Sequence, residues 1–282
     1  CNYTRLRQES KGVFDNYTWY IMEDFDDVLE RALEPYPLYR KLVEMKIDGY
    51  QNIEIQEALE KEFGINTTID SREVVKNSDI IVVAVKPNVY DNVLESVKDL
   101  IDDNKIIVTI AAGKTIASIE SIIGSDKKII RTMPNTPALV NEGMSALCKN
   151  KNITDEELTI VKTIFESFGK AEIVGEYLID AVIGASGSAP AYVFMFIEAM
   201  ADAVVSAGMP RNQAYKFVAQ AVMGSAKMVL ETDKHPGELK DMVCSPGGTT
   251  IEAVKTLEAE GFRSSVIKAI DNCIAKSIEM SK

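Results

Sequence analysis

The spacing of apolar residues changes twice along the chain. Two short runs, 80–85 and 106–110, are continuous and rich in β-branched residues, as in strands that are buried on both faces of a parallel sheet. Between these runs, apolar residues recur at helical spacing. We therefore predict an incomplete doubly wound (Rossmann-type) α/β domain over residues 58–152. Its strands are expected at 65–69, 79–85, 105–111, 128–133 and 144–148, and its helices at 71–76, 89–100 and 115–123.

From residue 154 onward the pattern is helical throughout, which predicts an all-helical domain over 153–282. Its most apolar run, 189–209, carries Glu198 and Asp202 at helical spacing, and we expect no segment of the chain to span a bilayer. We interpret this run as a buried helix at a dimer interface, since it is long and nearly uncharged. The helices are expected at 155–168, 178–184, 190–207, 211–231, 249–258 and 262–281.

Residues 1–57 follow neither pattern. An acidic helical stretch is interrupted by Pro35 and Pro37, and a turn at 47–50 precedes a third helix. The arrangement weakly resembles the start of a helix-turn-helix module, but no basic recognition helix follows. We interpret the segment as a helical hairpin, with a DNA-binding fusion as the less favoured alternative.

Composition excludes several classes of partner and site. The chain has 282 residues, 46% of them apolar, which indicates a soluble globular protein, and a net charge of −12, which disfavours nucleic acid and anionic membranes as partners. The cysteines Cys1, Cys148, Cys244 and Cys273 show no paired spacing and His235 is the only histidine, so we expect no metal site. Scattered cysteines and the lack of a secretory signal at the start lead us to expect a cytoplasmic protein.

A glycine-containing turn before a predicted helix contains several candidate site residues. The segment Ser245-Pro246-Gly247-Gly248-Thr249-Thr250 combines a proline, two glycines and three hydroxyls. Unpaired N–H groups and the positive end of a helix dipole suit a carboxylate or phosphate. An ordinary helix cap explains the same residues. His235 precedes Pro236-Gly237 in another expected helix start, and we predict a structural role for it rather than general acid catalysis.

Three further turns follow predicted parallel strands and should therefore meet at one edge of the sheet, where such folds bind ligands. They are Lys86-Pro87-Asn88, Ala111-Ala112-Gly113 and Pro134-Asn135-Thr136. Taken alone, Lys86 could be a solvated loop residue and Asn135 a turn residue.

From about residue 58 to the C-terminus the chain resembles pyrroline-5-carboxylate reductase. Several segments carry the resemblance, in the family's order: Ala84-Val85-Lys86-Pro87, Ala111-Ala112-Gly113, Arg131-Thr132-Met133-Pro134-Asn135-Thr136-Pro137, Ser186-Gly187-Ser188-Ala189-Pro190-Ala191-Tyr192, and His235-Pro236-Gly237-Glu238-Leu239-Lys240-Asp241 leading into the Ser245–Thr250 loop. The resemblance implies reduction of 1-pyrroline-5-carboxylate to L-proline, the last step of proline biosynthesis, with NADP or NAD as cofactor. It also implies a homodimer or higher homo-oligomer.

The resemblance assigns roles residue by residue. It implies that Thr250, Ser245 and Lys86 are catalytic, with Thr250 bonding the ring nitrogen. Substrate binding falls to Ser245, Gly247, Gly248, Thr249 and Thr250. Cofactor binding falls to Ala84, Val85, Lys86, Pro87, Ala111, Ala112, Gly113 and Asn135.

The resemblance stops short of the N-terminus. The family should open with a strand and a Gly-x-Gly-x-x-Gly turn, yet the only glycines before Gly113 are Gly12, Gly49 and Gly64. We therefore expect the glycine-rich first unit to be absent and residues 1–57 to be joined to the rest by fusion or a chimeric join. A catalytically inactive dimerisation or binding module derived from the enzyme is the alternative function.

Overall fold

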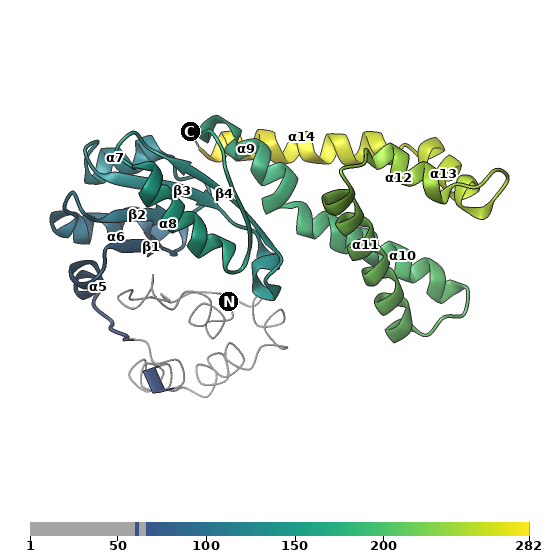
Figure 1. Cartoon of the computed structure of the whole chain (residues 1–282), viewed down its shortest axis with the longest axis horizontal. Helices are drawn as coiled ribbons and strands as arrows, with labels where there is room; N and C mark the ends of the chain where they lie inside the picture. The colour runs from purple at the N-terminus through teal and green to yellow at the C-terminus, as the bar shows by residue number, and fades with distance from the viewer. Residues whose placement is uncertain (1–59, 62–65, 282) are drawn as a thin grey trace. The chain divides into compact units, whose positions relative to one another are not determined.

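A computed structural model of the chain describes residues 60–61 and 66–281, which form two compact units (Figure 1). The first unit contains the described residues up to Val182 together with those from Ser277 onward, and the second is Ile183–Lys276. The predictions for residues 1–57, namely the helical hairpin, the missing glycine-rich unit and the join, lie outside the described residues. The domain boundaries proposed at 58 and 153 remain predictions.

The first unit is built on a sheet of five strands in the order β1-β2-β3-β4-β5. Strands β1, β2 and β3 are mutually parallel, β4 is antiparallel to β3, and β5 is parallel to β4. The predicted α/β class with a parallel-dominated sheet is confirmed. The strands are β1 (Ile80–Val83), β2 (Ile106–Thr109), β3 (Lys128–Met133), β4 (Gly143–Lys149) and β5 (Gly169–Ile173).

The strand register places three carboxyl ends at one edge of the sheet, with β3 continuing past the other two strands to Met133. Val83 of β1 pairs with Thr109 of β2, and Thr109 pairs with Arg131 of β3. The turns that follow these three strands therefore start from one edge of the sheet, as the sequence predicted.

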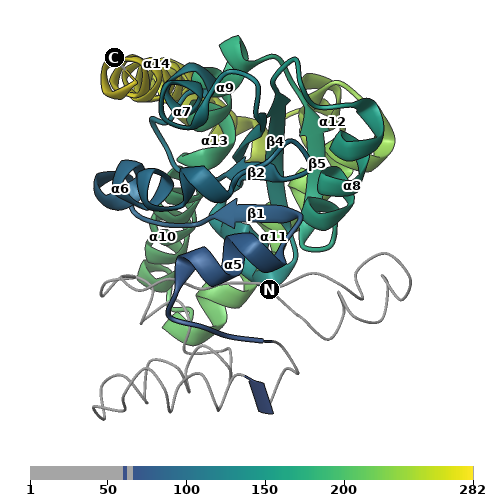
Figure 2. The ribbon, with the colours of Figure 1, turned by 90° about the vertical axis from the view of Figure 1, so that its left-hand side faces the viewer.

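Helices cover both faces of this sheet. Figure 2 shows α6 (Pro87–Val97) and α7 (Ile116–Ile123) on one side and α8 (Asp155–Glu166) on the other. The shorter α5 (Ser71–Asn77) precedes β1. Continuously apolar strands are buried on both faces because each face must be covered. On the α8 side the core contains Ile80, Ile106, Val108, Ile130, Leu147, Leu158, Val161, Ile164 and Phe165.

Two sequence predictions in the first unit are wrong. The described residues of the expected strand at 65–69 are not a strand: Thr67 and Thr68 bond to the carboxylates of Glu60 and Glu73, and Ile69 is 77% exposed. Conversely, β5 lies where only helices were expected. Ala171 is the one buried residue of β5, so the strand has no clear alternation of apolar and polar residues. It forms because it pairs with β4.

The second unit is helical, as predicted. It contains α10 (Ala189–Ser206), α11 (Arg211–Thr232), α12 (Pro236–Val243), α13 (Thr249–Ala259) and most of α14 (Phe262–Met280). The expected helix at 178–184 is replaced by a 3-10 turn (Glu176–Leu178), the short α9 (Ile179–Val182) and a π-helical turn (Ile183–Gly187).

Among the described residues, one helical stretch, Glu176–Ser206, is long and apolar enough to cross a membrane by length and composition alone. The expectation that no segment of the chain spans a bilayer stays a prediction. Within this stretch, Glu198 and Asp202 are the only charged residues of α10. Within one chain α10 buries only Ala201. The predicted interface burial of this helix is not tested by a single chain.

Candidate active site

The turn between β1 and α6 carries the first group of predicted cofactor residues. Ala84 and Val85 are half-buried, whereas Lys86 and Pro87 are exposed. Lys86 is the N-cap of α6, Pro87 begins the helix, and no side chain caps it. The positive end of α6 and the Lys86 ammonium thus lie together at the sheet edge, an arrangement that attracts an anionic group.

The turn between β2 and α7 carries the second group. Ala111 is buried and its N–H donates to Thr109 Oγ1 at 3.2 Å. Gly113 has φ +77°, a conformation that favours glycine, and a Cβ there would lie 3.4 Å from the carbonyl oxygen of Met280. Ala112 is exposed. This turn is held closely by its own unit.

The N-terminus of α7 differs from that of α6 because acceptors already fill it. Thr115 Oγ1 accepts from the N–H of Ser118 at 3.0 Å, and Glu176 Oε1 accepts from the N–H of Ile116 at 2.8 Å. Of the two helix starts at this edge, α6 is therefore the one that suits a cofactor phosphate.

Asn135 follows β3 and has a structural contact of its own. Its Oδ1 accepts from the N–H of Met144 at 2.8 Å, which ties the β3–β4 connection together. The turn role that the sequence left open is thus present. A contact of Asn135 with cofactor remains a prediction.

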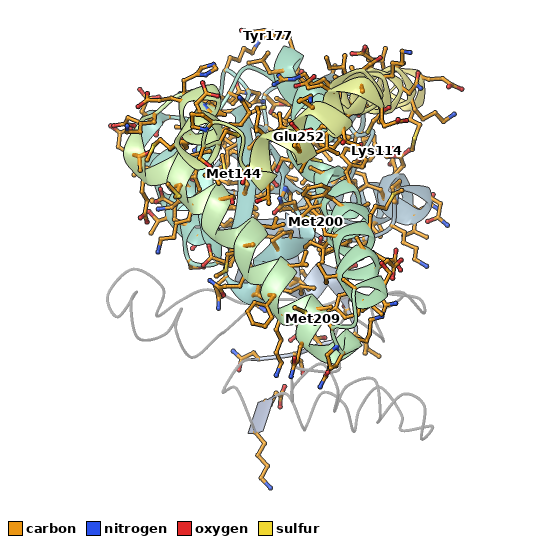
Figure 3. All side chains as sticks on the ribbon, turned by 90° about the vertical axis from the view of Figure 1, so that its right-hand side faces the viewer. Lys114, Met144, Tyr177, Met200, Met209 and Glu252 are labelled. Atoms are coloured by element: carbon orange, nitrogen blue, oxygen red, sulfur yellow. The ribbon has the colours of Figure 1, made fainter. Side chains whose placement is uncertain are left out.

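Sequence reasoning missed a cluster that links the two cofactor turns. Lys114 Nζ, on a side chain only 19% exposed, lies 2.7 Å from Asp91 Oδ1 and 5.6 Å from the ring centre of Tyr90 (Lys114 is labelled in Figure 3). Asp91 and Tyr90 belong to α6, whereas Lys114 follows Gly113. The only signal in the sequence is that Lys114 adjoins a turn already singled out, because the pairing depends on how α6 packs.

In the second unit, the predicted glycine turn is present before α13. The N–H of Gly248 donates to the carbonyl of Ser245 at 3.1 Å, and Gly247 has φ +66°. Pro246 and Gly247 thus occupy the central positions of a type II turn. Gly248 is the N-cap of α13, and no side chain caps the helix.

This turn arranges donors at the start of α13. The Gly248 N–H is used within the turn, so the remaining helix-start donors are the first-turn N–H groups of α13. A Cβ on Gly248 would lie 2.3 Å from Ser245 Oγ, which places the serine hydroxyl over the glycine. Thr250 is half-buried, while Ser245, Gly247 and Thr249 are exposed. The turn can therefore present amides and hydroxyls to a small anion.

His235 has the structural contact that the sequence favoured. It is the N-cap of α12, and its Nδ1 accepts from the N–H of Gly237 at 3.0 Å. A histidine that accepts at Nδ1 is well placed to hold a helix start.

Residues 60–61 and 66–281 contain no candidate metal-binding site. No group of three or more His, Cys, Asp or Glu side chains in that part could hold a metal ion. The site candidates are therefore the sheet-edge turns of the first unit and the Ser245–Thr250 turn of the second.

Comparison with known proteins decides the family. Residues 176–280 match the model for pyrroline-5-carboxylate reductase dimerisation, and the chain is 56% identical to the pyrroline-5-carboxylate reductase of Escherichia coli (strain K12) over 225 residues, 80% of this chain and 84% of that one. The chain belongs to the pyrroline-5-carboxylate reductase family. The resemblance noted from the sequence is confirmed.

Solved structures agree with this membership. The pyrroline carboxylate reductase of Plasmodium falciparum, solved with NADP bound, is 36% identical with a TM-score of 0.72, covering 77% of this chain and 83% of that one. The pyrroline-5-carboxylate reductase of Coxiella burnetii is 31% identical with a TM-score of 0.77, covering 87% and 95%. Residues 42–113 also match a family described as NADP oxidoreductase coenzyme F420-dependent, a match that begins within the segment to which the sequence resemblance did not extend.

The sheet-edge residues of this reductase family member fit a nicotinamide dinucleotide. An uncapped helix start beside Lys86 suits phosphate, and the turn at Gly113, with its positive φ, places backbone rather than a bulky side chain at the edge. An NAD(P) cofactor is therefore consistent with both the chemistry of the edge and the family.

Proposed function

We propose that this chain reduces 1-pyrroline-5-carboxylate to L-proline, the last step of proline biosynthesis, with NADPH or NADH as reductant. The observation that carries the proposal is 56% identity to the Escherichia coli enzyme over 80% of the chain. The geometries of the sheet-edge turns and of the Ser245–Thr250 turn support the proposal.

The substrate makes two demands that the Ser245–Thr250 turn meets. Its carboxylate needs donors, which the first-turn N–H groups of α13 and the Ser245 hydroxyl supply. Its ring nitrogen needs a proton donor so that the neighbouring carbon becomes electrophilic, and the half-buried Thr250 hydroxyl fills that role. Gly247, Gly248 and Thr249 shape the turn and complete the substrate site.

The cofactor belongs at the sheet edge of the first unit. It is held and oriented by Ala84, Val85, Lys86 and Pro87, by the Ala111–Gly113 turn and by Asn135. The Lys86 ammonium faces the negative charge of the cofactor phosphates. When bound there, a reduced nicotinamide supplies the hydride for the imine carbon.

The active form is a homodimer or larger homo-oligomer in the cytoplasm. Helices α10 and α11 expose large apolar side chains, among them Phe194 at 62%, Met195 at 70% and Phe217 at 66%. Surface of this kind needs a partner, and a second copy is the partner that a dimerisation match supports. The free thiols Cys148, Cys244 and Cys273 suit a reducing compartment.

Replacing Thr250 tests the catalytic part of the proposal. We expect Thr250→Ala to lower kcat by about a hundredfold, the usual effect of losing a proton donor. Its melting temperature should stay within about 2 °C of wild type, since no core contact is lost. Thr256→Ala is the matched control, because Thr256 lies in the same helix and its hydroxyl donates to the backbone carbonyl of Glu252 at 3.1 Å. If Thr250→Ala lowered thermal stability as strongly as it lowered turnover, the role of Thr250 would be to cap the helix and not to take part in the reaction.

A second function is favoured by one sequence fact. Before Gly113 the only glycines are Gly12, Gly49 and Gly64, too far apart for a Gly-x-Gly-x-x-Gly turn. A chain without that turn could serve as an inactive dimerisation or binding module. Titrating the protein with NADPH and following NADPH fluorescence separates the two: saturable binding with turnover supports the reductase, and no binding supports the module. Grafting a complete glycine-turn unit in place of residues 1–57 should then restore binding.

A further inference from the structure

Arg131 is a buried charge with one prominent partner. It lies in the middle of β3 with a side chain only 6% exposed, and its Nη1 is 2.9 Å from Glu176 Oε1. Burying a guanidinium is costly unless it is paired, so this contact matters to the fold. The residue opposite Arg131 in β4 is Cys148, and burial raises the pKa of its thiol to about 11. A neutral thiol cannot balance the charge, which leaves that task to Glu176.

The same carboxylate oxygen has a second contact in a different element. Glu176 Oε1 also accepts from the N–H of Ile116 at 2.8 Å, the first residue of α7. One atom therefore joins β3, the start of α7 and the 3-10 turn that begins at Glu176. At the positive end of α7, a carboxylate is favourably placed.

These contacts flank two of the turns assigned to the cofactor. Ile116 ends the connection that contains Ala111, Ala112 and Gly113, while Arg131 lies shortly before Pro134-Asn135. The first of these turns is also confined on its other side, since a Cβ on Gly113 would lie 3.4 Å from the Met280 carbonyl oxygen. A displacement of Ile116 would consequently move the turn itself.

We propose that Glu176 is a positioning residue for the nicotinamide cofactor. By binding Arg131 and the Ile116 N–H with one oxygen, it holds the Ala111–Gly113 turn at the edge of the sheet. It does not touch substrate in this role. The inference rests on the proposed function, because it assumes that this turn contacts a dinucleotide.

Three variants test the inference. Glu176→Ala removes both contacts, Glu176→Gln keeps an acceptor oxygen without the charge, and Glu172→Ala changes an exposed glutamate on the neighbouring β5 as the control. The measurements are NADPH affinity by fluorescence, KM for each substrate with kcat, and hydrogen exchange of residues 111–118 without cofactor. Thermal unfolding checks that each variant is folded.

For Glu176→Ala we expect NADPH affinity about tenfold weaker, equivalent to about 1.4 kcal/mol. Exchange should quicken at 111–118, while KM for the imine substrate at saturating cofactor should change less than about threefold. Glu176→Gln should lie between Ala and wild type, and Glu172→Ala should match wild type. If Glu176→Ala does not fold, a severalfold weaker NADPH affinity in Glu176→Gln still supports the proposal, and an unchanged one overturns it.

Two further results would overturn the proposal. One is wild-type NADPH affinity and exchange in folded Glu176→Ala. The other is an equal rise in both KM values with faster exchange across the whole unit, as a merely structural residue would give. If the wild-type chain binds no NADPH, the proposed function fails. The cofactor role of Glu176 then fails with it, whereas exchange at 111–118 still shows whether Glu176 holds the turn, because local loss of protection does not require cofactor.

Discussion

Two adjacent glycines in the Ser245–Gly248 turn are needed for different physical reasons. Gly247 has φ +66° and no atom within 4 Å of the position where a Cβ would lie, so its constraint is conformational. Gly248 has φ −80°, which any residue adopts, but a Cβ there would meet Ser245 Oγ at 2.3 Å. The first glycine sets the bend, and the second makes room for the serine hydroxyl.

Gly247→Ala should therefore strain the backbone without a clash. We expect a loss of about 1 kcal/mol in the free energy of unfolding and a lower kcat/KM, because alanine resists the left-handed region. Gly247→Asn should lose less, since asparagine tolerates that region. Gly224→Ala, in the middle of α11 with open space around it, should instead stabilise the protein by about 0.5–1 kcal/mol. Urea unfolding measures all three, and a Gly247→Ala protein as stable as wild type contradicts the assignment.

Tyr90 makes stability depend on alkaline pH. Its side chain is fully buried, and burial raises its pKa to about 12, although a contact of the hydroxyl with Thr109 acts in the opposite direction. Ionisation is thus easier in the unfolded chain, where tyrosine titrates near pH 10. The neutral hydroxyl contributes full stability below about pH 10, and that contribution is lost as pH rises toward about 12.

Comparing wild type with Tyr90→Phe isolates this effect. We expect the wild type to lose up to about 2–3 kcal/mol relative to Tyr90→Phe between about pH 10 and pH 12. Cys148, whose pKa is raised by burial to about 11, contributes equally to both proteins and cancels. Urea unfolding followed by circular dichroism at several pH values checks this. Parallel stability curves would mean that Tyr90 is not the group responsible.

At the scale of single elements, the sequence predicted a helix or strand correctly where the residues that define it are neighbours in the chain. The strand predicted at 128–133 is present with the same bounds, and the helix predicted from 155 begins at Asp155. Thr154 Oγ1 accepts from the N–H of Glu157 at 3.2 Å, and Glu157 Oε2 accepts from the N–H of Thr154 at 3.0 Å. This capping box lies within four consecutive residues, so the sequence alone contains it. Strand β5 has no such signal, because its partner β4 lies elsewhere in the chain.

Removing the cap of α8 should destabilise the first unit. We expect Thr154→Ala to lower the free energy of unfolding by about 1 kcal/mol, because the N–H of Glu157 loses its acceptor and the reciprocal pair of bonds is broken. Thr154→Ser keeps the hydroxyl and should stay close to wild type. Thermal unfolding of the three proteins provides the measurement, and equal melting temperatures for Ala and Ser would show that the hydroxyl contributes nothing.

At the scale of the whole molecule, the helical unit exposes several large apolar side chains within a single chain. Its helices α10 and α11 leave Phe194, Met195, Phe217 and Leu230 more than half exposed. Residues of this size are normally buried, so their exposure supports the proposal that a second subunit covers this surface. The sequence predicted a long apolar helix here, but which of its faces stays uncovered within the chain follows only from the packing of α10 on α11.

Phe194→Asp should weaken self-association. We expect wild type to elute as a dimer or larger species, and the variant to dissociate at a protein concentration at least about a hundredfold higher, because a charge would enter an apolar contact. Val140→Asp is the control, since Val140 is 54% exposed but lies outside residues 176–280, which match the dimerisation family. Light scattering during gel filtration measures both. A wild-type monomer, or equal effects of the two variants, would contradict the dimer.

The sequence by itself determined most elements, the sheet-edge turns and the glycine turn, because periodicity, caps and turn residues act over a few positions. Tertiary structure alone decided that β4 runs antiparallel to β3, that residues 169–173 form a strand, and that Arg131 meets Glu176 across 45 positions of sequence. Such contacts depend on strand pairing and on the burial of charge. Both are properties of the assembled sheet and have no counterpart in the local order of residues.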